Sequence, residues 1–144
     1  LPATIKAQLH DSDSLVRYWT LRGLTINEHS DITPYLADFH QLLDDPSVDV
    51  SVAAADLLVR HGIHADVSAG LNHLAGWITP SSNHFELMAA LTVIDNLGEK
   101  ASSLHAKISE FPGEDKTGLA RGYIFDVPNL ITHILDLEKT DARL

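Results

Sequence analysis

The sequence predicts an all-α fold built from stacked helical hairpins, and three observations support this prediction. A segment recurs with a period of about 35 residues. Each copy holds two stretches whose apolar residues are spaced as on one face of a helix, and no long stretch alternates with the period of two that a strand requires. Such repeats are typical of a right-handed α–α superhelix, so we expect about seven or eight helices.

The repeat is visible when residues 9–24 are aligned with residues 43–58, 34 positions later. In this alignment Leu9 falls on Leu43, Asp11 on Asp45, Val16 on Val50 and Leu24 on Leu58. A third copy lies 36 positions further on, where residues 51–62 (SVAAADLLVRHG) align with residues 87–98 (LMAALTVIDNLG). We predict a single domain over residues 1–144, with repeats at about 1–27, 33–62, 66–98 and 99–139.

Local signals place the helix ends near these repeat boundaries. Ser12 or Asp13 can cap the second helix, whose predicted inner stripe is Val16, Trp19, Gly23 and Ile26. Thr33 and Pro34 resemble the N-cap and first position of the next helix. After a restart at Pro46-Ser47, Gly62 is expected to end a helix in a left-handed turn, and Asp66 to cap the following one.

The second half carries similar signals. A loop at residues 79–83 precedes a helix that runs to Gly98, and residues 101–111 predict another helix with Leu104 and Ile108 inside. Pro128 is expected to begin the last helix. Residues 112–127 are compatible with a helix, a cap or a docking loop. The small residues Ala53-Ala54-Ala55 predict a place where a neighbouring helix approaches closely.

Composition limits the classes of partner. Twenty acidic and ten basic residues give a formal net charge of −10, which would be repelled by nucleic acid and by anionic lipid surfaces. No apolar run approaches the roughly 20 residues of a membrane span, and the chain has no cysteine. It opens with Leu1-Pro2 instead of an initiator methionine or a signal segment, so we expect a piece of a longer polypeptide or a processed product.

Two groups of residues suggest metal binding. His61 and His64 could present two imidazoles, but a zinc site needs three or four ligands and Gly62 interrupts the helix between them, so we interpret them as exposed loop histidines. The acidic pairs Asp11/Asp13 and Asp44/Asp45 could bind calcium or act as paired carboxylates. Both pairs precede a predicted helix start, which favours capping. The turn Glu114-Asp115-Lys116 is interpreted as solvated.

Catalytic patterns are weak. No Gly-x-Ser-x-Gly motif and no phosphate-binding glycine loop occurs, and the serines fall mostly at expected caps and loops, at positions 12, 14, 47, 81 and 82. Arg17-Tyr18-Trp19 could form a ligand platform, but a structural arginine paired with Asp11 or Asp13 is favoured. The sequence therefore predicts no catalytic, cofactor-binding or metal-ligating residue and no cofactor in this chain.

The residues Asp13-Ser14-Leu15-Val16-Arg17, and in the second copy Asp45 through Val50 with Ala53-Ala54-Ala55, resemble HEAT repeats. The family is armadillo-like in its fold, an α solenoid that mediates protein–protein contacts. Ser51 stands where the repeat usually has an arginine, so a continuous ladder of aspartate–arginine pairs is interrupted there.

A narrower resemblance covers roughly residues 5 to 110. Val16-Arg17-Tyr18-Trp19 with Gly23-Leu24, together with residues 53–58 and 89–98, is similar to the helical C-terminal region of some bacterial sulfatases. The resemblance implies a parent hydrolase of sulfate esters, periplasmic or secreted, with a divalent cation such as calcium. It also implies a formylglycine made from a Cys/Ser-x-Pro-x-Arg motif, which this sequence lacks, so no catalytic or metal residue is carried over.

These observations predict a non-catalytic HEAT-like scaffold or packing domain of a sulfatase-related hydrolase. Its partner would be the catalytic domain of the parent chain or another protein, and neither nucleic acid nor a membrane. The alternative is a free-standing adaptor that recruits a protein partner. A third possibility is a small repeat enzyme similar to a lyase or a DNA glycosylase, of which the acidic charge disfavours the DNA-binding version.

Overall fold

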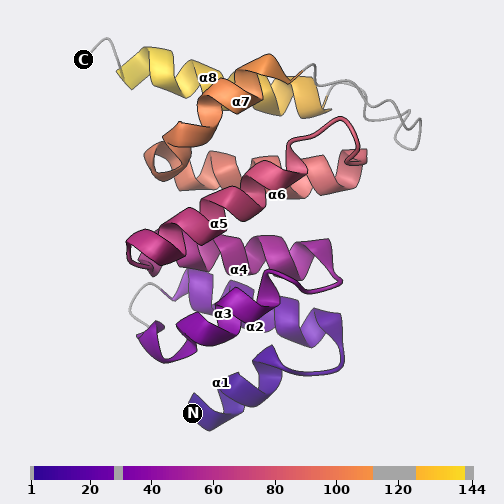
Figure 1. Ribbon diagram of the computed structural model, residues 1–144, viewed down its shortest axis with the longest axis vertical. Coiled ribbons are helices and arrows are strands. Elements are labelled where there is room, and N and C mark those ends of the chain that lie inside the picture. The colour runs from indigo at the N-terminus through magenta and orange to yellow at the C-terminus, as the bar shows by residue number, and fades with distance from the viewer. Residues whose placement is uncertain (1, 28–30, 112–125, 142–144) are drawn as a thin grey trace. The chain divides into compact units, whose positions relative to one another are not determined.

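The computed structural model describes residues 2–27, 31–111 and 126–141, and in these ranges the chain is helical and contains no strand (Figure 1). The all-α prediction is thus confirmed for the described residues, while the right-handed superhelical arrangement stays a prediction. The elements in chain order are α1 (Pro2–Leu9), α2 (Ser14–Ile26), the 3₁₀ turn η1 (Thr33–Tyr35), α3 (Leu36–Leu42), α4 (Val48–His61), α5 (His64–Trp77), α6 (His84–Leu97), the 3₁₀ segment η2 (Gly98–Leu104), α7 (His105–Glu110) and α8 (Asp126–Asp141).

The chain forms two compact units, residues 1–73 and 74–144. In the first unit α4 is the central helix and packs against both α2 and α3, while α1 packs against α2. In the second unit α6 packs against α8 and η2, and α7 packs against the same two elements. Within the described part of the chain, no helix is both long and apolar enough to span a membrane.

Helix α4 is buried on every side, with all ten residues from Val50 to Val59 inside. A helix without a polar face must be covered all round. Its two buried polar side chains are both satisfied, because the Ser51 hydroxyl donates to the carbonyl of Val48 (3.0 Å) and the Asp56 carboxylate accepts from Arg60 (2.7 Å). Burial nevertheless raises the pKa of Asp56, against the lowering effect of Arg60.

Two helix starts are capped by the residue types that the sequence suggested. Asp13 is the N-cap of α2 and accepts a hydrogen bond from the backbone N–H of Leu15 (2.8 Å). Asn83 caps α6 in a capping box, in which the Glu86 carboxylate returns a bond to the Asn83 N–H (2.8 Å). Gly98 ends α6 with a positive φ of 55°, the left-handed region that favours glycine.

Gly62 ends α4 as predicted, but not in a left-handed turn, and Asp66 does not precede the next helix as its N-cap. Gly62 has an extended backbone (φ −77°, ψ 170°) and is required for space, since a Cβ there would collide with the Leu58 carbonyl and the Asp66 side chain. Helix α5 begins at His64, so Asp66 lies within its first turn and reaches back to accept from the Ile63 N–H (2.9 Å). Similarly, α8 begins at Asp126 and not at Pro128.

The predicted inner stripe of α2 is also wrong. Trp19 is 65% exposed and Ile26 72% exposed, whereas the buried residues of this helix are Leu21 and Leu24. The physical reason is that α2 carries apolar residues on two faces, and α4 covers the face of Leu21 and Leu24. The face predicted to be inside therefore lies outside.

The predictions for the second unit are partly confirmed. Leu104 and Ile108 are buried, although the predicted helix over residues 101–111 is divided into η2 and α7. On α6, Leu91 and Ile94 are buried, but Phe85 is 62% exposed. Pro112-Gly113, the turn at residues 114–116 and most of the segment 112–127 lie outside the described residues.

The close helix approach predicted from small residues occurs where α5 crosses α4. A Cβ on Gly70 of α5 would lie 2.7 Å from Val59 Cγ2 and 2.8 Å from the carbonyl oxygen of Ala55. The second atom belongs to the backbone and cannot rotate away. Gly70 therefore sets the distance between the two helices.

A matched pair of glycine substitutions tests this contact. Gly70→Ala should lower the free energy of unfolding by about 1–3 kcal/mol, because the two helices must separate. Gly23→Ala, at a helical glycine where a Cβ meets nothing within 4 Å, should raise it by about 0.5–1 kcal/mol. Urea unfolding of both variants provides the measurement, and equal effects would contradict the close approach.

Candidate functional site

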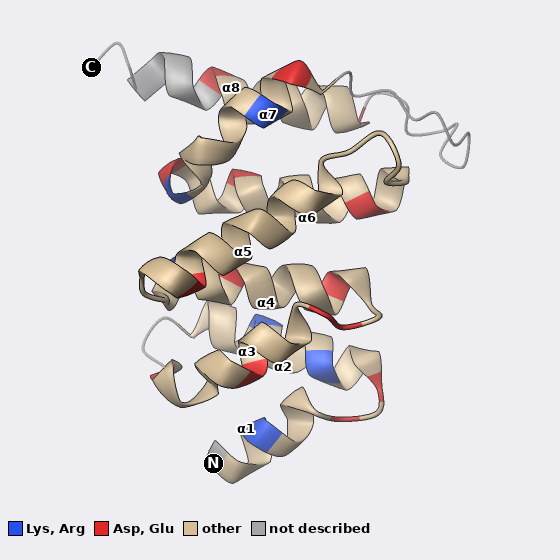
Figure 2. Cartoon of the chain, in the orientation of Figure 1, with Lys and Arg blue, Asp and Glu red and all other residues tan. Residues whose placement is uncertain are grey.

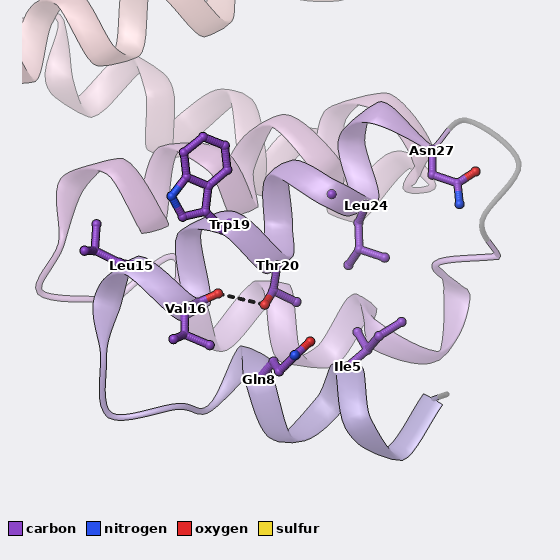
Figure 3. A pocket seen from close by; sticks show the side chains of 9 residues that line it. Ile5, Gln8, Leu15, Val16, Trp19, Thr20, Leu24 and Asn27 are labelled. Carbon is purple, nitrogen blue, oxygen red and sulfur yellow. Dashed lines mark hydrogen bonds between the residues drawn. The ribbon is translucent and has the colours of Figure 1, made fainter.

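Helices α1 and α2 enclose an open groove of about 590 Å³ on the surface of the first unit (Figure 3). Two residues of α1 and six of α2 line it, together with Asn27, which follows α2. They are Ile5, Gln8, Leu15, Val16, Trp19, Thr20, Gly23, Leu24 and Asn27. The groove is therefore lined by the apolar face of α2 that the sequence assigned to the interior.

The residues that line the groove are suited to apolar packing rather than to catalysis. Leu15 and Trp19 are 64% and 65% exposed. The Thr20 hydroxyl donates to the carbonyl of Val16 (2.7 Å), so its polar group is already paired within α2 (Figure 3). Gly23 leaves a hollow, since no atom outside its own helix lies within 4 Å of where its Cβ would be. None of the nine described residues that line the groove has a titratable side chain that could transfer a proton.

Arg17 has the structural role that the sequence predicted, but with a different partner. Its Nε and Nη2 donate to the two carboxylate oxygens of Asp45 (2.7 and 2.9 Å), and its Nη1 donates to the carbonyl of Asp11 (2.7 Å). The hydrogen bonds to Asp45 raise the pKa of the guanidinium. Asp11 and Asp13 are not its carboxylate partners because their side chains bind backbone N–H groups instead.

The acidic pairs lie in the α1–α2 and α3–α4 loops (Figure 2). Asp11 Oδ1 accepts from the N–H of Asp13 (2.8 Å), and Asp45 Oδ1 accepts from the N–H of Ser47 (2.9 Å). These are equivalent turns 34 residues apart. Asp45 also holds Arg17, so Asp11, Asp13 and Asp45 organise loops and helix starts, whereas the N-cap of α4 is Ser47, which makes no side-chain capping bond.

The structure places His61 at the end of α4 and His64 at the start of α5, both exposed. They do not share a helix face. Within residues 2–27, 31–111 and 126–141, no three histidine, aspartate or glutamate side chains are grouped so that they could hold a metal ion.

Sequence reasoning missed two histidine–aspartate pairs in the first unit. His10 Nε2 lies 2.7 Å from Asp38 Oδ1, and His40 Nε2 lies 2.7 Å from Asp66 Oδ1. The first pair connects the end of α1 to α3, and the second connects α3 to α5. The two pairs have similar spacings, 28 and 26 residues, which are shorter than the 34-residue repeat, so the repeat did not reveal them.

One serine lies beside a histidine, as nucleophilic catalysis would require. The Ser51 hydroxyl is 3.0 Å from His73 Nε2, and burial lowers the pKa of His73. However, Ser51 is only 1% exposed. A substrate cannot reach this hydroxyl, so the pair has a structural role at the position where a HEAT repeat would have an arginine.

Substituting Arg17 tests the fork geometry of its ion pair. Arg17→Lys should lower the free energy of unfolding by about 1.5–3 kcal/mol, because an ammonium cannot bind both Asp45 oxygens and the Asp11 carbonyl. Arg22→Lys on the same helix should have a much smaller effect. Chemical denaturation of both variants measures these free energies of unfolding. Equal losses in the two variants would contradict a stabilising role of the bidentate geometry.

A pH series tests the His40–Asp66 pair. The hydrogen bond from His40 lowers the pKa of Asp66, and the bond from the Ile63 N–H adds to this effect. The stabilisation is therefore fully present above the pKa of an unfolded aspartate, about 3.9, and is lost as the pH falls through the lower folded value. Asp66→Asn should lower the melting temperature at pH 5 to 7, and the difference should shrink below about pH 4.

The exposed Asp49 of α4 provides the control, since Asp49→Asn should give a small difference from the native chain at every pH. A deficit of Asp66→Asn that persists unchanged to the lowest pH would contradict the assigned ion pair.

Comparisons with protein families, with curated proteins and with solved structures gave no match for this chain. The similarity to HEAT repeats and to the C-terminal region of sulfatases therefore depends on the residues quoted for it. What the structure adds is the position of those residues, above all the outward face of α2.

Proposed function

We propose that this chain is a non-catalytic, HEAT-like packing domain that uses the α1–α2 groove to dock onto another folded protein. The exposed face of α2 carries this proposal. Of the five large apolar side chains that are exposed in the described part of the chain, three lie on this one helix, namely Leu15, Trp19 and Ile26. Exposed apolar groups concentrated in one place indicate an interaction surface, whereas scattered ones do not.

The resemblance to sulfatases suggests the identity of the docked element. It would be the catalytic domain of a parent hydrolase of sulfate esters, which would supply the formylglycine and the divalent cation. The role of this chain would then be to pack against that domain. The Thr20 hydroxyl is paired within α2, and none of the described lining residues is titratable, which agrees with such a role.

Hydroxyl-radical footprinting of the full polypeptide that carries this sequence tests the proposal. We expect Trp19 and Leu15 to be oxidised several-fold more slowly in the full polypeptide than in residues 1–144 alone, with the exposed Ile63 as the internal reference. Equal oxidation rates of Trp19 in the two samples would refute docking through this groove.

The sequence of the same polypeptide separates the two candidate identities. A Cys/Ser-x-Pro-x-Arg motif ahead of Leu1 would support the sulfatase assignment, and its absence would remove it. Protection of Trp19 only after a second protein is added would favour the free-standing adaptor, for which the same groove is the recruiting surface.

A further inference from the structure

The groove residues can be compared with the residues at equivalent positions of the next repeat. Shifting the six groove residues of α2 by the 34-residue repeat gives six residues of α4, of which Asp49, the equivalent of Leu15, is exposed and the other five are buried. Val16, Trp19, Thr20, Gly23 and Leu24 correspond to Val50, Ala53, Ala54, Leu57 and Leu58. These five α4 residues are at most 4% exposed and belong to the core that includes Leu21 and Leu24 of α2. Five groove positions of α2 thus have equivalents on α4 that belong to the core shared with α2, and one of them, Leu58, also lies against Gly70 of α5.

The two groove residues of α1 also have buried equivalents one repeat later. Ile5 and Gln8 correspond to Phe39 and Leu42 of α3, which are 0% and 5% exposed in the same core. Seven of the nine equivalents of the groove residues are covered, whereas Asp49 and His61, the equivalents of Leu15 and Asn27, are exposed. At the groove itself Trp19 is largely exposed, and Gln8 and Gly23 are also open to solvent. The α1–α2 groove thus continues an interface that the α3–α4 hairpin already forms with α2.

The aspartate that binds arginine in that interface has an equivalent in the loop between α1 and α2. Arg17 on α2 binds Asp45, which the Ser47 N–H holds in place. Asp11 is the equivalent of Asp45, and the Asp13 N–H holds it in the same way. No ion pair within 4.0 Å is found for the Asp11 carboxylate among the described residues, although its charge helps to raise the pKa of Arg17, whose Nη1 donates to the Asp11 carbonyl.

We propose that the groove receives an amphipathic helix of a protein partner, seated as α2 is seated on α4, with an arginine that binds the Asp11 carboxylate. This inference rests on the proposed function and names its partner. The open space at Gly23, where α4 has Leu57, leaves room for a large apolar side chain on the incoming helix. The partner is thus recognised by leucine-like residues on its inner face and one arginine in register with Asp11.

A stapled peptide with the sequence of residues 11–27 is a suitable probe, because α2 already presents this pattern to α4. Its staple replaces Trp19 and Gly23, which lie one turn apart on the outward face. The chain has two tryptophans, so the substitution Trp77→Phe in the protein leaves Trp19 as its only tryptophan. Saturable binding with a blue shift of the Trp19 emission is expected.

The register is tested by a double-mutant cycle between protein and peptide. Asp11→Asn keeps an oxygen for the Asp13 N–H but removes the charge, and Arg17→Ala in the peptide removes the arginine. Each change alone should weaken binding about tenfold, and the second should add little once the first is made. Independent effects of the two changes would overturn the proposed pairing.

Two glycine variants control for the position of binding. Gly23→Glu places a charge in the groove and should abolish binding, whereas Gly76→Glu on α5, where a Cβ also meets nothing within 4 Å, should leave it unchanged. Absence of any blue shift with the peptide would overturn the inference even if footprinting shows Trp19 protected in the full polypeptide. A blue shift caused by raising the protein concentration alone would identify a second copy as the occupant and would also overturn it.

Discussion

The burial of α4 is the constraint on which the first unit depends. Ten consecutive residues of this helix are inside, so no side of it can face water. Helices α2 and α3 cover one side, and α5 crosses the other so closely that Gly70 has no room for a side chain. The Arg17–Asp45 fork fixes how α2 approaches, since a bidentate pair restricts both distance and orientation. A helix of this kind is stable only between two neighbours.

The same reasoning explains why α2 differs from α4. Both helices occupy the same place in a 34-residue repeat, but only Leu21 and Leu24 of α2 are buried, compared with ten residues of α4. Its other face retains the residues of a helix interface, with Trp19 at the rim and a hollow at Gly23. Asp11 is held in the geometry in which Asp45 binds arginine. The groove is best understood as half of an interface.

Periodicity and capping residues predicted the helices well, because those signals are local. Asp13 and Asn83 cap helices where short polar side chains precede apolar repeats, and Gly98 ends one in the left-handed region. The inner stripe of α2 could not be chosen correctly, since a helix with two apolar faces gives two equally periodic patterns. Leu21 and Leu24 proved to be inside because α4 is on that side, which only the fold determines.

The errors at individual sites have a similar origin. Arg17 was paired with the nearest aspartates in sequence, but those carboxylates are used by the backbone, and Asp45 comes from 28 residues away. The histidine–aspartate pairs at His10 and His40 also join residues distant in sequence. Gly62 was assigned a turn conformation, whereas its real constraint is the space beside Asp66. The groove itself became visible only when the repeat was compared with burial.

A crystal structure of the chain with the stapled helix bound would test the central claim most directly. Superposing α1–α2 with its bound helix on α3–α4 with α2 should place the incoming arginine on Asp11 as Arg17 lies on Asp45, with a leucine above Gly23. A helix bound elsewhere, or one crossing the groove without reaching Asp11, would contradict the claim that the groove continues the internal repeat.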